Sequence, residues 1–216
     1  MSQFRYTRPD RFPPIVKNLL IINILVWIAQ LIYDRQWGLT PKIALWPIDS
    51  PFFEPYQVAT HMFAHASYDA NGNISFFHIL FNMIALFMFG RVLENVWGPK
   101  RFLGFYLACG LGAAVTHLAM QEIMGGFSPA VGASGAIMGV FVAFAYLFPN
   151  TELLLIPIPF PIKAKWLAIG YILLDLFGGF GQIARDNIAH FAHLGGVVTG
   201  FLIVFIWNKT NRRTLY

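Results

Sequence analysis

Six long apolar runs are the feature that most limits how this chain can fold. They cover about residues 16–33, 76–97, 102–124, 134–148, 166–177 and 189–207. Most approach the roughly 20 residues that a helix needs to cross a bilayer core. Because backbone polar groups in lipid must be satisfied within the segment, these runs predict helices. Only 12% of the residues are charged, about half the share of a soluble domain. The sequence therefore predicts an all-α, polytopic membrane protein with six transmembrane helices.

Lysine and arginine positions predict the orientation of these helices. An even number of helices puts both termini on one side, and most basic residues fall on that side: Arg5, Arg8, Arg11, Lys17, Arg91, Lys100, Arg101, Lys163, Lys165, Lys209, Arg212 and Arg213. Because basic residues gather on the cytoplasmic side, we expect a multi-pass protein of the cell (inner) membrane with both termini in the cytoplasm. The net charge of +5 is then a topology signal helped by membrane lipids, and nucleic acid is not an expected partner.

The runs divide the chain into three regions. Residues 1–15 are predicted to be a cytoplasmic tail, residues 16–207 the six-helix membrane domain, and residues 208–216 a second cytoplasmic tail. The external connection over 34–75 is too apolar for a solvated loop, so we expect short helical pieces partly embedded in the membrane. Residues 178–181 are three glycines and a phenylalanine, which predicts a mobile external loop after the fifth helix.

Two histidines in the long connection, His61 and His65, are four residues apart and would share one helical face. They can be a metal-binding pair or a hydrogen-bonding brace for the loop. No acid stands beside them as in the H-E-x-x-H motif, which favours the brace. Cys109 is the only cysteine, so a cysteine-based zinc site is excluded. We expect no metal and no cofactor.

Polar side chains recur near the outer ends of the helices that run inward. His78 and Asn82 lie one turn apart on the second helix, Ser134 begins the fourth, and His193 lies near the start of the sixth. Polar residues inside a span are costly and normally face a cavity or a partner. The fourth and sixth helices carry G-x-x-x-G spacings at Gly135, Gly139, Gly196 and Gly200. Such spacings let helix backbones approach closely, so we expect these side chains to meet in one depth band.

The fourth helix opens with Gly132-Ala133-Ser134-Gly135. A serine here can be a plain N-cap or a nucleophile beside N–H groups that are open to an anion. The convergence with His193 favours the nucleophile, because an activated serine needs a base within about 2.6–3.2 Å. His78, Asn82 and the Ser134 N–H can supply donors where negative charge develops.

Three motifs together resemble the rhomboid family of intramembrane serine proteases. They are His78-Ile79-Leu80-Phe81-Asn82, Gly132-Ala133-Ser134-Gly135 and Ala192-His193-Leu194-Gly195-Gly196. The resemblance covers about residues 16–207 and implies a six-helix rhomboid-like bundle. It implies Ser134 as the nucleophile and His193 as the general base, a dyad without an acid. His78, Asn82 and the Ser134 N–H would form the oxyanion hole, with His61 and His65 in a supporting part.

The reaction that this resemblance implies is hydrolysis of peptide bonds within or beside the transmembrane segments of membrane proteins. The family favours a small residue before the cut and helix-destabilising residues nearby. The fifth helix and residues 178–181 would move for substrate access. The chain departs from the pattern at Met138, where many bacterial members have a tyrosine that stacks on the catalytic histidine; an S–aromatic contact is the available substitute. The family's Trp-Arg pair in the first loop is also absent.

Three other functions remain open at this point. A catalytically inactive rhomboid-like protein that binds membrane clients would keep the fold, although the presence of both Ser134 and His193 argues against it. A transporter or channel would need charged residues near mid-membrane, whereas Glu94 and Asp175 both lie near predicted helix ends. A zinc enzyme would use the histidines, and metal analysis of the purified protein tests it.

Overall fold

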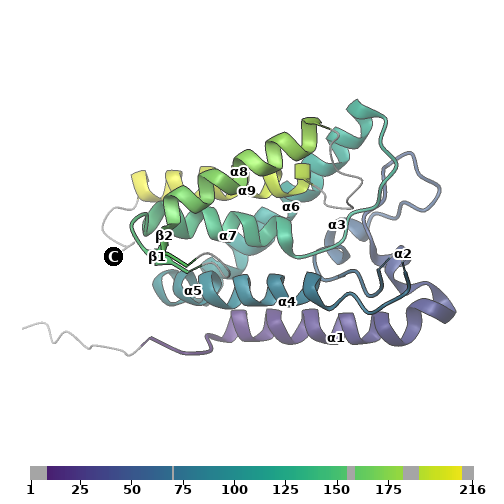
Figure 1. The fold of residues 1–216 in the computed structure, drawn as a ribbon, viewed down its shortest axis with the longest axis horizontal. Coiled ribbons are helices and arrows are strands. Elements are labelled where there is room, and N and C mark those ends of the chain that lie inside the picture. Colours follow the sequence, from purple (N-terminus) through teal and green to yellow (C-terminus); the bar gives the residue numbers. More distant parts are fainter. Residues whose placement is uncertain (1–8, 70, 155–158, 182–189, 211–216) are drawn as a thin grey trace, which may run out of the picture.

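The computed structural model describes residues 9–69, 71–154, 159–181 and 190–210, and its regular structure is mostly helical (Figure 1). The main helices are α1 (Pro14–Trp37), α4 (Phe76–Ala85), α5 (Arg91–Trp97), α6 (Pro99–Met124), α7 (Ser134–Leu147), α8 (Ala164–Gly181) and α9 (His190–Thr210). The smaller elements are α2 (Leu39–Ile43), α3 (Gln57–Thr60), the π-helical turn η1 (Leu86–Gly90) and the antiparallel strands β1 (Glu152–Leu153) and β2 (Ile162–Lys163). The predicted all-α class is confirmed.

Four helical segments among the described residues are long and apolar enough to cross a membrane. They are α1, the continuous run α4–η1–α5, α6 and α9, while α7 is a shorter apolar helix. A polytopic membrane protein is thereby confirmed, and the count of six spans stays a prediction. The helices alternate in direction, and α1 begins at the end of the bundle where α9 finishes (Figure 1). Residues 1–8 and 211–216 of the predicted tails lie outside the described residues.

The central helix of the bundle is α7. Nearly every one of its 14 residues is buried, and it packs against η1 and against helices α4, α5, α6, α8 and α9. In contrast, α1 buries only Val16, Leu19, Asn23 and Gln30 and exposes many of its other apolar side chains, as a lipid-facing helix does. At 1.5 Å per residue α7 spans about 21 Å, which is less than a hydrocarbon core of about 30 Å. Its first residue can therefore lie below the membrane surface.

Four glycines allow α7 and α9 to touch backbone to backbone. A Cβ at Gly200 would lie 2.7 Å from the Cα of Gly139 and 2.8 Å from its carbonyl oxygen. A Cβ at Gly196 would overlap the carbonyl group of Gly135. Side chains at these positions would push the helices apart. The close approach predicted from the G-x-x-x-G spacing is thus confirmed.

The connection from α1 to α4 contains α2 and α3, as the prediction of short helical pieces required. The expectation that His61 and His65 share one helical face is wrong, because α3 ends at Thr60 and His65 lies beyond it in non-helical backbone. Gln30 on α1 holds that backbone: its Oε1 accepts a bond from His65 N at 3.0 Å, and its Nε2 donates to His65 O at 2.8 Å. Bonds to a buried side chain replace the bonds of a helical turn.

The prediction of a loop at residues 178–181 is also wrong, because α8 continues to Gly181. The glycines make room for α9. A Cβ at Gly179 would lie 2.9 Å from the ring of Phe191, and one at Gly178 would overlap the ring of His190. Packing between α8 and α9 therefore overrides the local preference of a glycine cluster for a turn.

Candidate active site

Ser134 is the first residue of α7 and not its N-cap, so the alternative of a capping serine is wrong. Ala133 occupies the N-cap position and no side chain caps the helix. The preceding Gly132 has a φ of 130°, which side-chain-bearing residues rarely adopt, and its N–H donates to the carbonyl oxygen of His61 at 2.9 Å. The first N–H groups of a helix have no intrahelical partner. Ser134 thus lies where developing negative charge is favoured.

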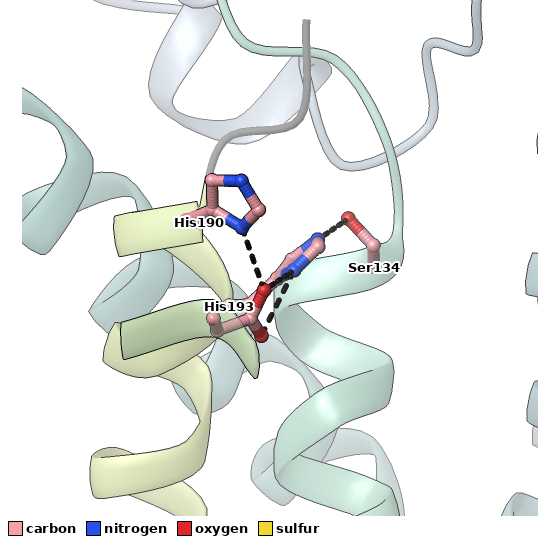
Figure 2. Close-up of polar contacts among 4 residues, drawn as sticks. Ser134, His190 and His193 are labelled. Atoms are coloured by element: carbon pink, nitrogen blue, oxygen red, sulfur yellow. Dashed lines mark hydrogen bonds and ion pairs between the residues drawn. The ribbon is translucent and has the colours of Figure 1, made fainter. Parts of the chain in front are cut away.

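His193 on α9 meets the side chain of Ser134. Its Nε2 lies 2.9 Å from Ser134 Oγ (Figure 2), a distance that suits a nucleophile and its base. The histidine is buried, with 8% of its surface exposed. The contact joins the N-terminal ends of α7 and α9, the two helices that the glycines bring together.

The other nitrogen of His193 faces a carboxylate that the sequence analysis left outside the site. His193 Nδ1 lies 3.1 Å from Oδ1 and 3.2 Å from Oδ2 of Asp175 on α8. Asp175 is 3% exposed, and its Oδ1 is also 2.9 Å from Nδ1 of His190. An ionised carboxylate can only accept, so the proton of a neutral His193 belongs on Nδ1. Its Nε2 is then free to accept the hydroxyl hydrogen of Ser134. The one sequence signal that could have identified Asp175 as a site residue is its position as an acid within an apolar run.

His78 on α4 lies beside the same space. Its Nδ1 accepts a hydrogen bond from the backbone N–H of Ala66 at 3.2 Å, so a neutral His78 carries its proton on Nε2. A Cβ placed on Gly132 would lie 3.2 Å from His78 Nε2 and 3.4 Å from Ser134 Oγ. The donor of His78 and the hydroxyl of Ser134 therefore flank one small region. The ring of His65 packs edge-on against His78, with centroids 5.2 Å apart.

Asn82 and Met138 lie deeper in the bundle. Asn82 Nδ2 donates to the carbonyl oxygen of His78 at 2.8 Å, which leaves one amide hydrogen for another acceptor. The structure thus places Asn82 one turn below His78 and bonded to its own helix. Met138 is 7% exposed and belongs to the main apolar core, one turn below Ser134 on α7.

His61 and His65 lie in the connection between α1 and α4, where His61 O accepts from Gly132 N–H and the ring of His65 packs on His78. Burial lowers the pKa of His61 to about 4, while burial together with the nearby His78 lowers the pKa of His65 to about 3. Both rings are therefore neutral at pH 7. His61 Nδ1 bonds the carbonyl oxygen of Gln57 at 3.0 Å.

A small cavity next to Ser134 is lined by His61, Met62, Gly110, Gly132 and Ala192. Within the described ranges, no three His, Cys, Asp or Glu side chains are grouped as metal ligands.

The fold and the site define a helical, polytopic membrane protein with a serine–histidine contact at the N-terminal end of its central helix. A family model for the Rhomboid domain matches residues 53–210. The chain therefore belongs to the rhomboid family.

Individual relatives support this assignment. The chain is 34% identical over 133 residues to Rhomboid protein 1, mitochondrial, from Saccharomyces cerevisiae, covering 59% of this chain and 37% of that protein. It is 27% identical over 190 residues to human Presenilin-associated rhomboid-like protein, mitochondrial, covering 88% and 47%. It is 34% identical over 130 residues to Rhomboid protease GluP from Bacillus subtilis, covering 60% and 23%. The chain spans less than half the length of these three relatives.

The predicted localisation, a cell (inner) membrane with both termini in the cytoplasm, is wrong. The yeast and human relatives are named as mitochondrial proteins, which points to a mitochondrial membrane and not to a bacterial cell membrane. The reasoning failed because basic residues report which face of a membrane a loop occupies. They carry no information on which membrane it is.

Proposed function

We propose that this protein is an intramembrane serine endopeptidase that cleaves transmembrane or juxtamembrane segments of membrane proteins. The observation that carries the proposal is the 2.9 Å contact between Ser134 Oγ and His193 Nε2. A partly buried hydroxyl and a buried imidazole at this distance have the geometry of a nucleophile and its general base. Membership of a family that includes a named rhomboid protease supports the same reaction class.

In the proposed mechanism, Ser134 Oγ attacks the carbonyl carbon of the scissile peptide while His193 Nε2 takes its proton. The protonated imidazole then gives that proton to the leaving amine, and an acyl-enzyme remains on Ser134. A water molecule, deprotonated by the same nitrogen, attacks the ester and releases the acid product. Each half of the reaction restores the neutral imidazole.

Negative charge that develops on the carbonyl oxygen needs donors that are already in place. We assign this part to the Ser134 N–H at the start of α7 and to His78 Nε2–H, with the remaining amide hydrogen of Asn82 as a third donor. The tautomer of His78 supports its role, because the Ala66 N–H occupies Nδ1. Met138 would fill the space one turn below the nucleophile.

The site favours extended or easily unwound substrate segments. A peptide bond can be attacked only after its surrounding backbone leaves an intact helix, since helical carbonyls are bonded and shielded. This requirement supports the expected preference for helix-destabilising residues near the cut and a small residue before it.

We place the membrane domain at residues 16–207, with residues 1–15 and 208–216 as tails, and infer a mitochondrial membrane from the named relatives.

Cleavage of a transmembrane reporter in proteoliposomes tests the proposal. Ser134→Ala and His193→Ala are expected to abolish cleavage, and a fluorophosphonate probe is expected to label the unchanged protein but not either variant. Ser75→Ala is the matched control, because Ser75 precedes α4 without a side-chain capping bond. Full cleavage by Ser134→Ala would refute the mechanism. Reporter binding without cleavage by the unchanged protein would instead support the inactive, client-binding alternative.

A further inference from the structure

We propose that Asp175 is a positioning residue for His193, so that the proposed protease works through a Ser134–His193–Asp175 relay of hydrogen bonds. The inference rests on the proposed function and adds a residue to it. The chain of contacts runs from α7 through α9 to α8, three helices that pack on one another. Figure 2 shows the two ends of this chain at Ser134 and His190, with His193 between them.

Both oxygens of the carboxylate are engaged with the imidazole edge opposite to Ser134. Oδ1 and Oδ2 lie 3.1 and 3.2 Å from His193 Nδ1. The carboxylate holds one ring nitrogen and the 2.9 Å contact with Ser134 holds the other, so both the position and the orientation of the ring are restrained. A histidine bonded only at Nε2 would keep rotational freedom about its side-chain torsions, and its lone pair would be less often directed at the hydroxyl.

The carboxylate also selects the reactive tautomer. A neutral imidazole has one donor and one acceptor nitrogen, and the partner of one nitrogen decides the role of the other. With Nδ1–H donating to Asp175, Nε2 presents its lone pair to Ser134 Oγ. The opposite tautomer would place a hydrogen between Nε2 and the hydroxyl, and Nε2 would then be unable to accept a proton.

During attack on the substrate, His193 becomes positively charged in a site with little water. Asp175 is 3% exposed, so its negative charge acts on the imidazolium with little screening. Among the described residues, the other titratable groups around this pair include His78 on α4, His190 on α9 and Tyr171, one turn before Asp175 on α8. Of the groups named here, only Asp175 carries a negative charge at neutral pH, because the others are histidines and a tyrosine.

His190 explains why the carboxylate can hold this position. Its Nδ1 donates to Oδ1 at 2.9 Å, and its ring packs against Gly178 on α8. A buried carboxylate without partners is costly, and two imidazole donors satisfy it from one side. His190 thus holds Asp175 in place, and Asp175 in turn orients the reactive His193.

The test combines kinetics with a pH profile. Asp175→Asn keeps size and shape but removes the charge, and its amide can donate to His193 Nδ1 and impose the unreactive tautomer. We expect kcat for reporter cleavage to fall about 100-fold or more with KM changed less than about threefold, since Asp175 does not touch substrate. The acidic limb of the kcat/KM profile should move to lower pH by about one unit, because the protonated imidazole loses its counter-charge.

Asp34→Asn is the matched control. Asp34 is a partly buried acid at the end of α1, bonded to the backbone N–H of Thr40 at 2.5 Å and to the hydroxyls of Thr40 and Ser67. It should change stability without moving the pH profile. Asp175→Asn with near-normal kcat and an unmoved profile would overturn the inference, while Ser134→Ala remaining inactive would leave the proposed function intact.

A second measurement uses the unchanged protein and so does not depend on whether Asp175→Asn folds. Selective ¹⁵N-histidine NMR of the unchanged protein, with His193 assigned by comparison with His193→Ala, reports which ring nitrogen carries the proton. Protonated Nδ1 at neutral pH is expected from the bond to Asp175. Protonated Nε2 with bare Nδ1 would refute the role of the carboxylate whatever the kinetic variants do.

Discussion

The backbone contact between α7 and α9 makes a quantitative prediction about Gly200→Ala. The added Cβ would lie 2.7 Å from the Cα of Gly139, about 0.7 Å short of the 3.4 Å at which ordinary contact begins. The clashing atoms are backbone, so a rotamer change cannot relieve the overlap. If the helices separate by that amount at the level of the site, the 2.9 Å contact between Ser134 and His193 becomes about 3.6 Å, which is no longer a hydrogen bond.

A misplacement of about 1 Å can cost 10²-fold in rate, so we expect kcat for reporter cleavage to fall about 10- to 100-fold in Gly200→Ala. Gly196→Ala should be worse, because its Cβ overlaps the carbonyl group of Gly135 only one turn from His193. Gly104→Ala on α6 is the matched control, since its Cβ would meet nothing within 4 Å. It should cleave normally and melt at the same temperature or higher.

Thermal unfolding in detergent separates displacement of the site from loss of the fold. The reasoning requires variants of Gly196 and Gly200 that remain helical and assembled but cleave slowly. Wild-type cleavage rates in both variants, with normal thermal stability, would show that the close approach of α7 and α9 does not set the geometry of Ser134 and His193.

Three further predictions concern other parts of the chain. His78→Ala should lower kcat about 10²- to 10³-fold by removing one donor to the developing oxyanion; an unchanged kcat would exclude that role. Glu94→Gln should lower the melting temperature by roughly 4–8 °C without changing the pH profile of cleavage. Both Glu94 oxygens accept bonds from the N–H groups of Ile15 and Val16, at 2.9 and 2.7 Å, and loss of about 2 kcal/mol from such charge-assisted bonds gives that shift. The pKa of His61 is about 4 in the folded protein against its usual 6.5, so the unfolded chain takes up the proton first as pH falls. Stability should therefore be full above pH 6.5 and decline by up to about 3 kcal/mol towards pH 4, and His61→Gln should flatten that decline in thermal melts.

The sequence carried most of the information on the helices. Apolar runs gave their order and approximate limits, and the glycine spacing identified the pair that touches, because both signals are local. The π-helical turn at Leu86–Gly90 had no such signal. It lies within an uninterrupted apolar run, and only contacts across the bundle reveal it: a Cβ at Gly90 would lie 3.1 Å from both Phe102 and Val16.

The contact of Asp175 with His193 could not be read from spacing. The two residues lie on different helices, and the rotation of each helix about its axis is set by the packing of side chains that the pattern does not order. Interpreting residues 178–181 as a loop also hid the relation, because it ended the fifth helix early and separated α8 from His190. Once the glycines are placed against α9, the carboxylate and both histidines face one another.

The position of the site along the bundle follows from where buried polar groups can be satisfied. Each costs several kcal/mol without a partner, and the second half of α7 lies in the main apolar core, to which its Phe141 and Phe144 belong. At the N-terminal end of α7 the connection between α1 and α4 supplies backbone partners: Ala66 N–H donates to His78, and His61 O accepts from Gly132 N–H. The same connection pairs with the loop before α7, through the bridge between Leu45 and Ala130. A serine, two histidines and a carboxylate can therefore be held together at that end, and moving them one turn towards the middle of α7 would leave most of their bonds unmade.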